Sequence, residues 1–541
     1  MKKHISLYLI LLFVLCSSFV KKSADLIVKN ATIYTVDKKF QQASVLVVLN
    51  GKFIAVGGKE LLEKYQSKEV MDASGKFIYP GFIDAHCHFT GYALDQYKLN
   101  LYGTASYKEM LEKITDYAKK NKREWIEGRM WSESSWQDAT DITKNDLDRL
   151  FPNQPVFLLR IDAHAALCNQ KAFDLAGITQ DTKIEGGEIQ IKNNELTGLL
   201  FDNAIEFVKS KIPSVDEATA IEYYQKTEQE FFENGITSFV DCMVENNWWR
   251  WMQKAYSDKK ISIQSSLFLT HTKENINDLF NQKFKQISNC NIAGFKIFAD
   301  GSLGSRGAYL LEEYTDQHNH RGYMTTSISA IDSFTKKMIK SNYQLAVHAI
   351  GDGANHEVLT IFSTYLKQKN DRRWRIEHAQ VVDSTDVHLF GDFSIIPSVQ
   401  PTHAMSDMLW VKDRIGEDRM KNAYAYQSLL KQNHWMPLGT DFPVEELNPI
   451  NTFCAAVFRK NQSQKPTNGF QSENALSRQE ALKGMTIWAA KSVFKEKEVG
   501  SIEKGKLADF VILSIDLMNA DMNEIYQAKP EQVYLNGKRM K

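Results

Sequence analysis

Between residues 80 and 495, short apolar runs recur along the chain, and each is followed by a connection long enough for a helix. Near-continuous apolar strands that alternate with helical segments are typical of a parallel sheet covered by helices. We expect eight such strands, the number that closes a (β/α)8 TIM barrel in the α/β class. The first ends at His88, and the others span 235–242, 261–270, 292–300, 344–348, 374–378, 393–400 and 436–441.

The two ends of the chain have a different pattern, with β-branched runs separated by turn signals. Residues 25–79 contain runs such as Val45-Leu46-Val47-Val48, followed by the turn pair Asn50-Gly51. Similar runs return within residues 496–541. Such runs are typical of short strands joined by tight turns. We therefore expect one small composite β-sandwich built from both ends of the chain.

One connection between expected barrel strands is much longer than the others. The segment between His88 and Gly235 has about 145 residues, far more than an ordinary βα loop. It contains an amphipathic pattern at 107–120 and an apolar run at 156–161. We therefore expect an inserted subdomain, at about residues 100–230, on the active-site face of the barrel.

The first 18 residues have the pattern of a secretory signal. Lys2 and Lys3 precede an apolar stretch that ends near Leu15, and small residues follow. The stretch is shorter than the roughly 20 residues that a membrane-spanning helix needs. We expect an exported, periplasmic protein without an integral membrane span. A lipid anchor at Cys16 is the alternative, although Leu15 is bulkier than lipoprotein signals usually carry.

The composition of the chain argues against some classes of partner but does not point to a function. The chain has 541 residues with 66 basic and 66 acidic side chains, so its formal net charge is zero. Nucleic-acid-binding proteins normally show a basic excess, which argues against such a partner and leaves a small molecule as the expected substrate. The six cysteines form no Cys-x-x-Cys pair and lie in apolar contexts, which favours buried free thiols. A homo-oligomer remains open.

Polar residues follow the expected strands at the end where barrel enzymes build their sites. In a strand ending Phe82-Ile83-Asp84-Ala85-His86-Cys87-His88, the two histidines point to the same face. The carboxyl ends of parallel barrel strands meet at one rim, so further polar strand ends converge on this pair. Imidazole and carboxylate suit zinc and its first-row neighbours, so we expect a divalent metal, zinc above all, in one or two ions. The expected ligands are His86, His88, Lys296, His348, His378 and Asp441.

Lys296 is the unusual member of this set. A lysine near the inward end of an apolar strand is costly unless it is paired or chemically altered. Its neutral amine can add carbon dioxide to become a carbamate, an anionic ligand that bridges two cations. The alternative is an ordinary lysine that pairs with Asp300.

These residues and their flanking motifs resemble the amidohydrolase superfamily over nearly the whole chain after the signal, and most of all the branch that includes N-substituted formamide deformylases. The matching motifs are Phe295-Lys296-Ile297-Phe298-Ala299-Asp300-Gly301-Ser302, Val347-His348-Ala349-Ile350-Gly351-Asp352, Arg375-Ile376-Glu377-His378-Ala379-Gln380, Gln400-Pro401-Thr402-His403, Gly439-Thr440-Asp441-Phe442-Pro443 and Gly505-Lys506-Leu507-Ala508-Asp509-Phe510.

The resemblance implies a division of labour among the ligands. His86, His88 and Asp441 would hold one metal and His348 and His378 a second, with carbamylated Lys296 bridging if two are present. Asp441 would also be the catalytic residue that orients the nucleophilic hydroxide, takes its proton and passes it to the leaving nitrogen.

Three further residues are candidate substrate contacts. His403 follows strand seven, where a supporting role behind the ligands is the alternative. Arg306 lies in the glycine-rich 301–307 loop and could bind a carboxylate, or it could simply order that loop. His164, in Asp162-Ala163-His164-Ala165-Ala166-Leu167, lies in the insertion and could line the pocket.

The leading hypothesis is therefore an exported metal-dependent hydrolase that cleaves a carbon–nitrogen bond of amide or N-acyl type. A deaminase or another hydrolase on the same scaffold is the alternative within enzymes, although single-metal deaminases of the superfamily typically lack the lysine at position 296. A periplasmic protein that binds metal or ligand without catalysis is the alternative outside enzymes, but it would not need Asp441. These motifs do not indicate which compound is the substrate.

Overall fold

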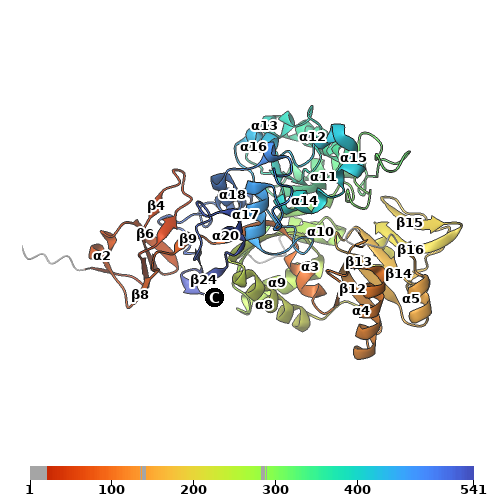
Figure 1. Ribbon diagram of the computed structural model, residues 1–541, viewed down its shortest axis with the longest axis horizontal. Coiled ribbons are helices and arrows are strands. Elements are labelled where there is room, and N and C mark those ends of the chain that lie inside the picture. The colour runs from red at the N-terminus through yellow and green to blue at the C-terminus, as the bar shows by residue number, and fades with distance from the viewer. Residues whose placement is uncertain (1–20, 134–135, 137–141, 282–286, 288) are drawn as a thin grey trace, which may run out of the picture.

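A seven-stranded parallel sheet forms the centre of the molecule in a computed structural model that describes residues 21–133, 136, 142–281, 287 and 289–541 (Figure 1). The strands lie in chain order, each hydrogen-bonded in parallel to the next. Their inward and outward faces are both buried, which explains their nearly continuous apolar sequences. The strands are β10 (Phe82–Cys87), β17 (Ile236–Val244), β18 (Gln264–Thr270), β19 (Cys290–Phe298), β20 (Gln344–Ala349), β21 (Arg375–His378) and β22 (Ile396–Ser398).

An extended segment at 436–441 takes the place of an eighth strand. Leu438 pairs in parallel with Val399 beyond β22, and Phe442 pairs in parallel with Cys87 of β10. These isolated bridges join the two edges of the sheet into a nearly closed, TIM-like barrel. The prediction of a regular strand here was wrong, because prolines at 437 and 443 lack the N–H groups that a ladder needs and Asp441 has a φ of 60°.

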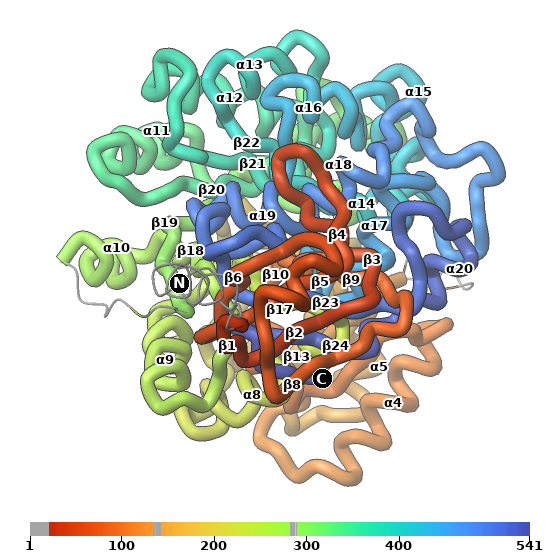
Figure 2. Tube along the Cα trace, turned by 90° about the vertical axis from the view of Figure 1, so that its left-hand side faces the viewer, coloured from red at the N-terminus to blue at the C-terminus, as the bar shows by residue number. Residues whose placement is uncertain are grey.

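Helices surround the barrel, as the end-on view in Figure 2 shows. They alternate with the strands along the chain, and several begin with a side-chain cap, such as Asp216, whose carboxylate accepts from Thr219 N. The helices after β10 are α3 (Phe89–Asp95), α8 (Glu217–Glu233), α9 (Asn246–Ser257), α10 (Lys273–Phe280), α11 (Ile328–Met338), α12 (Asp352–Leu366), α13 (His388–Asp392), α14 (Pro401–Asp407), α15 (Val411–Met420), α16 (Tyr426–Asn433), α17 (Pro449–Phe458), α18 (Arg478–Gly484) and α19 (Ile487–Ser492).

The long connection between α3 and α8 forms a sheet of its own, at the lower right of Figure 1. Its six strands lie in the order β11-β12-β13-β14-β16-β15, and two clusters of buried apolar residues support them. The amphipathic pattern at 107–120 is a helix, as expected. The elements are β11 (Leu99–Asn100), α4 (Tyr107–Lys120), β12 (Ile126–Trp131), α5 (Asn145–Leu150), β13 (Val156–Arg160), β14 (Ala165–Cys168), α6 (Gln170–Ala176), β15 (Gly187–Lys192), β16 (Glu195–Asp202) and α7 (Ile205–Lys209).

Strands from both ends of the chain lie together at the left of Figure 1. One sheet has the order β6-β5-β2-β8, and the other has the order β25-β24-β23-β9-β3-β4, which mixes strands from the two ends. A single apolar cluster contains residues of both sheets. The strands are β2 (Leu26–Lys29), β3 (Thr32–Tyr34), β4 (Gln42–Ala43), β5 (Val45–Leu49), β6 (Lys52–Gly57), β8 (Glu69–Asp72), β9 (Phe77–Pro80), β23 (Phe510–Leu513), β24 (Pro530–Leu535) and β25 (Lys538–Arg539), and β1 (Lys22–Ser23), β7 (Tyr65–Gln66), α2 (Leu61–Lys64) and α20 (Met522–Tyr526) complete this end.

The expected signal, residues 1–18, and Cys16 lie outside the described residues. Within the described part of the chain, no helix is both long and apolar enough to cross a bilayer. The other five cysteines are buried and free, as expected.

Candidate metal centre

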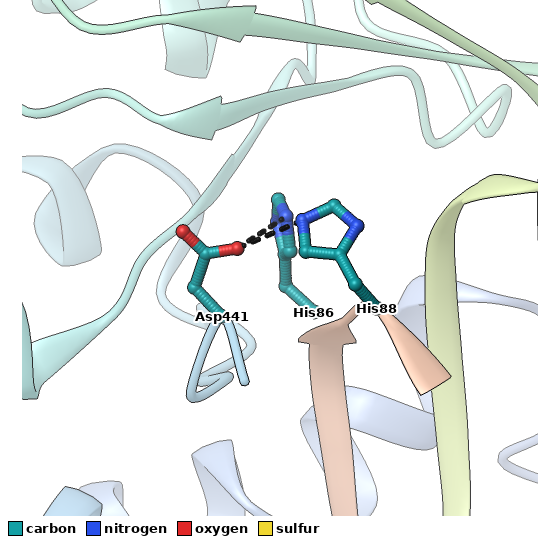
Figure 3. Close-up of side chains that lie close together, drawn as sticks. All are labelled: His86, His88 and Asp441. Atoms are coloured by element: carbon teal, nitrogen blue, oxygen red, sulfur yellow. Dashed lines mark ion pairs between the residues drawn. The ribbon is translucent and has the colours of Figure 1, made fainter. Parts of the chain in front are cut away.

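His86, His88 and Asp441 come together at the carboxyl end of β10. Asp441 Oδ1 lies 3.3 Å from His86 Nε2 and 3.0 Å from His88 Nε2, so one carboxylate oxygen faces two imidazoles (Figure 3). His86 is fully buried and Asp441 is 5% exposed. The His-x-His pair and the aspartate that the sequence placed on different strands therefore meet at one point.

Backbone contacts and one buried carboxylate bring the two ligand segments together. Asp441 N donates to His86 O at 2.7 Å. The Asp84 carboxylate accepts from the backbone N–H groups of His86 and Thr440 and from the Thr440 hydroxyl, at 3.1, 3.0 and 2.5 Å. Burial raises the pKa of Asp84 to about 6. Asp84 thus ties the end of β10 to the segment that carries Asp441.

Two histidines are oriented by partners on the ring nitrogen that faces away from the centre. His86 Nδ1 lies 2.6 Å from Glu377 Oε2, and His378 Nδ1 lies 2.8 Å from Gln400 Oε1. A hydrogen bond at Nδ1 fixes the ring and leaves Nε2 available as a ligand. Glu377 is itself held by Arg375, whose guanidinium bonds both of its oxygens.

Burial sets most of the protonation states at the centre. It lowers the pKa of His88, and it lowers the pKa values of His348 and His378 well below the usual value, which keeps these imidazoles neutral. Burial alone would raise the pKa of Asp441, but the adjacent His86 and His88 bring it well below its ordinary range. For His86, burial opposes the charge, yet neighbouring anionic groups raise its pKa well above the usual value.

The unsatisfied atoms of the cluster fit a cation. Buried polar atoms in proteins normally have hydrogen-bond partners, but a group of them at this rim forms no hydrogen bond of normal geometry with the described residues, namely His86 Nε2, His88 Nδ1, His403 Nε2, Asp441 Oδ1 and Lys296 Nζ. Ligand atoms of His86, His88 and Asp441 lie within 4.8 Å of one another, and the same is true of His378, His403 and Asp441. The donors are imidazoles and a carboxylate, the set that zinc accepts.

Lys296 is buried at 1% exposure, and its Nζ lies 4.6 Å from the centre of the Phe298 ring. The alternative pairing with Asp300 is absent among the described residues, because Lys296 Nζ has no hydrogen-bond partner. Asp300 instead accepts from the backbone N–H groups of Tyr309, Ile350 and Gly351 at 2.9, 3.0 and 2.8 Å. No carboxylate of the described residues hydrogen-bonds to the amine.

His348 lies at the end of β20, where the fifth strand was expected, and His403 lies next to Asp441. The His348 ring lies 4.6 Å from that of His378, but its Nε2 is turned toward Gly301 O at 3.3 Å. His403, expected as a substrate contact, lies with its Nε2 3.5 Å from Asp441 Oδ2. The second oxygen of Asp441 thus faces His403, which sequence reasoning did not count among the ligands.

The other two candidate contacts have different surroundings. Arg306 forms a two-pronged ion pair with Asp316 at 3.1 and 2.8 Å, which supports the reading that it orders its loop. His164 reaches the ring cluster from the insertion, with its ring 5.2 Å from that of His348. Glu377 was missed as a partner of His86, although its position two residues after Arg375 on one strand was a signal.

Comparison with known proteins adds independent findings. A profile described as the amidohydrolase family matches residues 69–540. The chain is 32% identical to Protein LONG AFTER FAR-RED 3 of Arabidopsis thaliana, over 96% of this chain and 91% of that protein. It is 25% identical to an N-substituted formamide deformylase of Arthrobacter pascens, over 95% of this chain and 97% of that enzyme. A crystal structure described as an uncharacterized metal-dependent hydrolase from Pyrococcus horikoshii is similar with a TM-score of 0.75 and 26% identity, over 92% of this chain and 99% of that one.

Proposed function

Because the chain belongs to the amidohydrolase family, a family of metal-dependent hydrolases, we propose that it cleaves a carbon–nitrogen bond of amide or N-acyl type in a small molecule. The observation that carries this proposal is the convergence of His86, His88 and Asp441 at the carboxyl rim of the barrel. The resemblance to an N-substituted formamide deformylase over nearly the full length of both chains supports the choice of bond.

His86, His88 and Asp441 are the residues that would hold a divalent ion, with zinc best suited to the donor set. His378 would contribute to a second position together with His348 or His403. A bound ion of this kind supplies Lewis-acid chemistry, since it acidifies water and polarises a carbonyl group.

Asp441 carries the proton transfer in the proposed reaction. Its carboxylate is ionised, since neighbouring histidines hold its pKa well below the ordinary range. It can therefore accept a proton from the attacking water and return it to the leaving nitrogen as the carbon–nitrogen bond breaks. The φ of 60° at Asp441 and the hydrogen bond from Asp441 N to His86 O fix where this carboxylate lies.

Lys296 is proposed to act as a carbamate. Its buried amine forms no hydrogen bond within the described part of the chain, and addition of carbon dioxide to the neutral amine, with loss of one proton, would give an anion near the histidines of the rim. That anion would serve as a ligand between two ions.

Metal analysis and a hydrolysis panel test the proposal. Protein purified without chelators should contain zinc or a neighbouring metal in at least one equivalent, measured by plasma mass spectrometry. The metal-replete protein should hydrolyse at least one compound in a panel of N-formyl, N-acyl, ureido and lactam substrates. Asp441→Asn should lose about 100-fold or more of that activity. Metal-free wild-type protein, or full activity in Asp441→Asn, would overturn the proposal.

The same panel separates the alternatives. Hydrolysis of an acyl compound releases a carboxylic acid and an amine, whereas a deaminase releases ammonia from an amino-substituted ring. Release of ammonia from aminopurines or aminopyrimidines, without acid from any acyl compound, would favour the deaminase. Metal binding without turnover of any compound would favour a binding protein.

A further inference from the structure

A hydrogen-bonded chain runs from the insertion to the ring cluster. His164, just before β14, places its Nδ1 2.5 Å from Asp202 Oδ1, at the end of β16. The Tyr323 hydroxyl, from the connection after β19, donates to Asp202 Oδ2 at 2.5 Å. Both oxygens of this carboxylate are therefore engaged, and His164 is held on its Nδ1 side by two other segments of the chain.

The loop after β19 is shaped around the same carboxylate. A Cβ atom at Gly301 or Gly307 would come within 2.7 or 2.8 Å of Asp202 Oδ2, so neither position has room for a side chain while Asp202 stays in place. Ser302 Oγ in this loop also donates to Asp162 of the insertion at 2.8 Å. The loop and the insertion are thus fitted to each other at the point that orients His164.

His164 has one ring nitrogen left for another partner. Its ring lies 5.2 Å from that of His348 and 6.1 Å from that of Phe298, at the β19–β20 side of the rim. Nε2 hydrogen-bonds to no group among the described residues, and the side chain is 13% exposed. Although burial lowers the pKa of His164, the charge of Asp202 raises it overall.

We propose that His164 contacts the acyl group of the substrate through Nε2, with Asp202 and Tyr323 as the residues that position it. The proposal rests on the proposed function and deepens it. His86, His88 and Asp441 lie at the β10 side of the rim and His164 lies at the β19–β20 side, so an acyl group over the histidine cluster would have the reacting water on one side and His164 on the other. The insertion would then take part in recognising the scissile bond.

A purely structural role for His164 makes the opposite prediction for two substitutions. The amide of an asparagine at 164 would replace Nδ1 and retain the bond to Asp202, but it would not reach the place of Nε2. The amide of a glutamine would reach the place of Nε2 while giving up the bond to Asp202. A substrate contact therefore makes His164→Asn the more damaging change, and a scaffold role makes His164→Gln the more damaging one.

Binding of acetohydroxamate, a small acyl compound that chelates metals, is measured by calorimetry on the metal-replete protein. His164→Asn should weaken binding about tenfold or more, the effect of losing one hydrogen bond to a polar ligand. His164→Gln should lose less, and Tyr323→Phe, which keeps the ring and removes the hydroxyl, should also lose less. Metal content should stay at the wild-type level in all three. On the best substrate of the hydrolysis panel, the same order should appear in kcat/KM.

His356→Asn is the matched control, because His356 also bonds an aspartate, Asp386 at 2.9 Å, but lies 46% exposed on α12. It should bind acetohydroxamate like the wild type. Wild-type affinity in His164→Asn, or a larger loss in His164→Gln than in His164→Asn, would overturn the inference. Loss of metal in step with loss of binding would also overturn it. Failure of the proposed function would instead appear in the wild type, as absence of metal or of any hydrolysis.

Discussion

At the scale of single residues, the sequence indicated which side chains could bind a metal, but it did not indicate which groups would hydrogen-bond to them. The spacing of His86 and His88 on a strand places both on one face, and the fold brings Asp441 to them. The bond from His86 Nδ1 to Glu377 joins two strands almost 300 positions apart in the chain, and Arg375 holds both oxygens of Glu377 from the same strand, β21. The spacing of Arg375 and Glu377 indicated an ion pair within one strand, but the contact of Glu377 with His86 depends on how the barrel closes.

Glu377→Gln tests this support. A glutamine can accept from His86 Nδ1 but cannot neutralise Arg375, which is fully buried. We expect metal affinity to fall about 10- to 100-fold, as for other groups that orient a metal-binding histidine. Competition with a chromogenic chelator measures this metal affinity. Glu498→Gln, at an exposed ion pair with Lys495, should keep wild-type affinity.

Lys296→Ala tests the carbamate. The change removes the amine and leaves space where the anion would lie, so we expect activity to fall about 100-fold or more, the scale of losing one charge-stabilising group. Added acetate or propionate should restore part of the lost activity, because its carboxylate would fill the space that the lysine side chain leaves. An unchanged rate in Lys296→Ala would remove this residue from the site.

At the scale of elements, the sequence pattern predicted where the segments lie more accurately than it predicted how they pair and pack. The run at 436–441 lies between β22 and β10 as expected, but it pairs only through isolated bridges. The glycines at 301 and 307 were recognised only as part of a glycine-rich loop, and the structure shows that each makes room for the carboxylate of Asp202. Their purpose is visible only when the insertion is packed on the loop.

Gly307→Ala should therefore lower activity indirectly, by displacing Asp202, which orients His164. The new methyl group would press on Asp202 Oδ2 and displace the bond to Tyr323. We expect kcat/KM to fall about tenfold, with metal content unchanged, because the displaced group lies beside the ligands rather than among them. Gly505→Ala is the control for the new methyl group, since a Cβ there meets nothing within 4 Å, although its φ of 97° adds strain. If both variants lose kcat/KM equally, the displacement of Asp202 is not the cause.

At the scale of the whole molecule, the two ends of the chain meet in one mixed sheet, in which β9 lies between β3 and β23. Asp509, just before β23, is buried there, with Oδ1 accepting from Asn536 N at 2.7 Å. Burial raises its pKa to about 7. This group links the stability of the assembled ends to pH.

The sign of this linkage follows from the raised pKa. The folded state holds the Asp509 proton up to about pH 7, whereas the unfolded chain loses it near the ordinary aspartate pKa of 3.8, so this contribution to stability declines as the pH rises between those values. Asp509→Asn keeps an acceptor for Asn536 N without the charge. We expect the variant to exceed the wild type in free energy of unfolding by on the order of 2 kcal/mol at pH 8. The difference should shrink toward pH 5, as urea unfolding at both values would measure; a constant difference would contradict the linkage.

The sequence by itself determined the kind of fold and the residue types that gather at the rim. Apolar strands at barrel spacing, several of which end in His, Lys or Asp, favour a parallel barrel with a candidate metal-binding edge, because strand direction alone places those ends together. Tertiary structure decided which ligand atoms face one another. It turned His348 Nε2 toward Gly301, brought His403 to Asp441 and left the Lys296 amine without a hydrogen bond to any described residue. It also joined His164 to Asp202 and Tyr323, since contacts between distant segments depend on packing geometry that no local pattern contains.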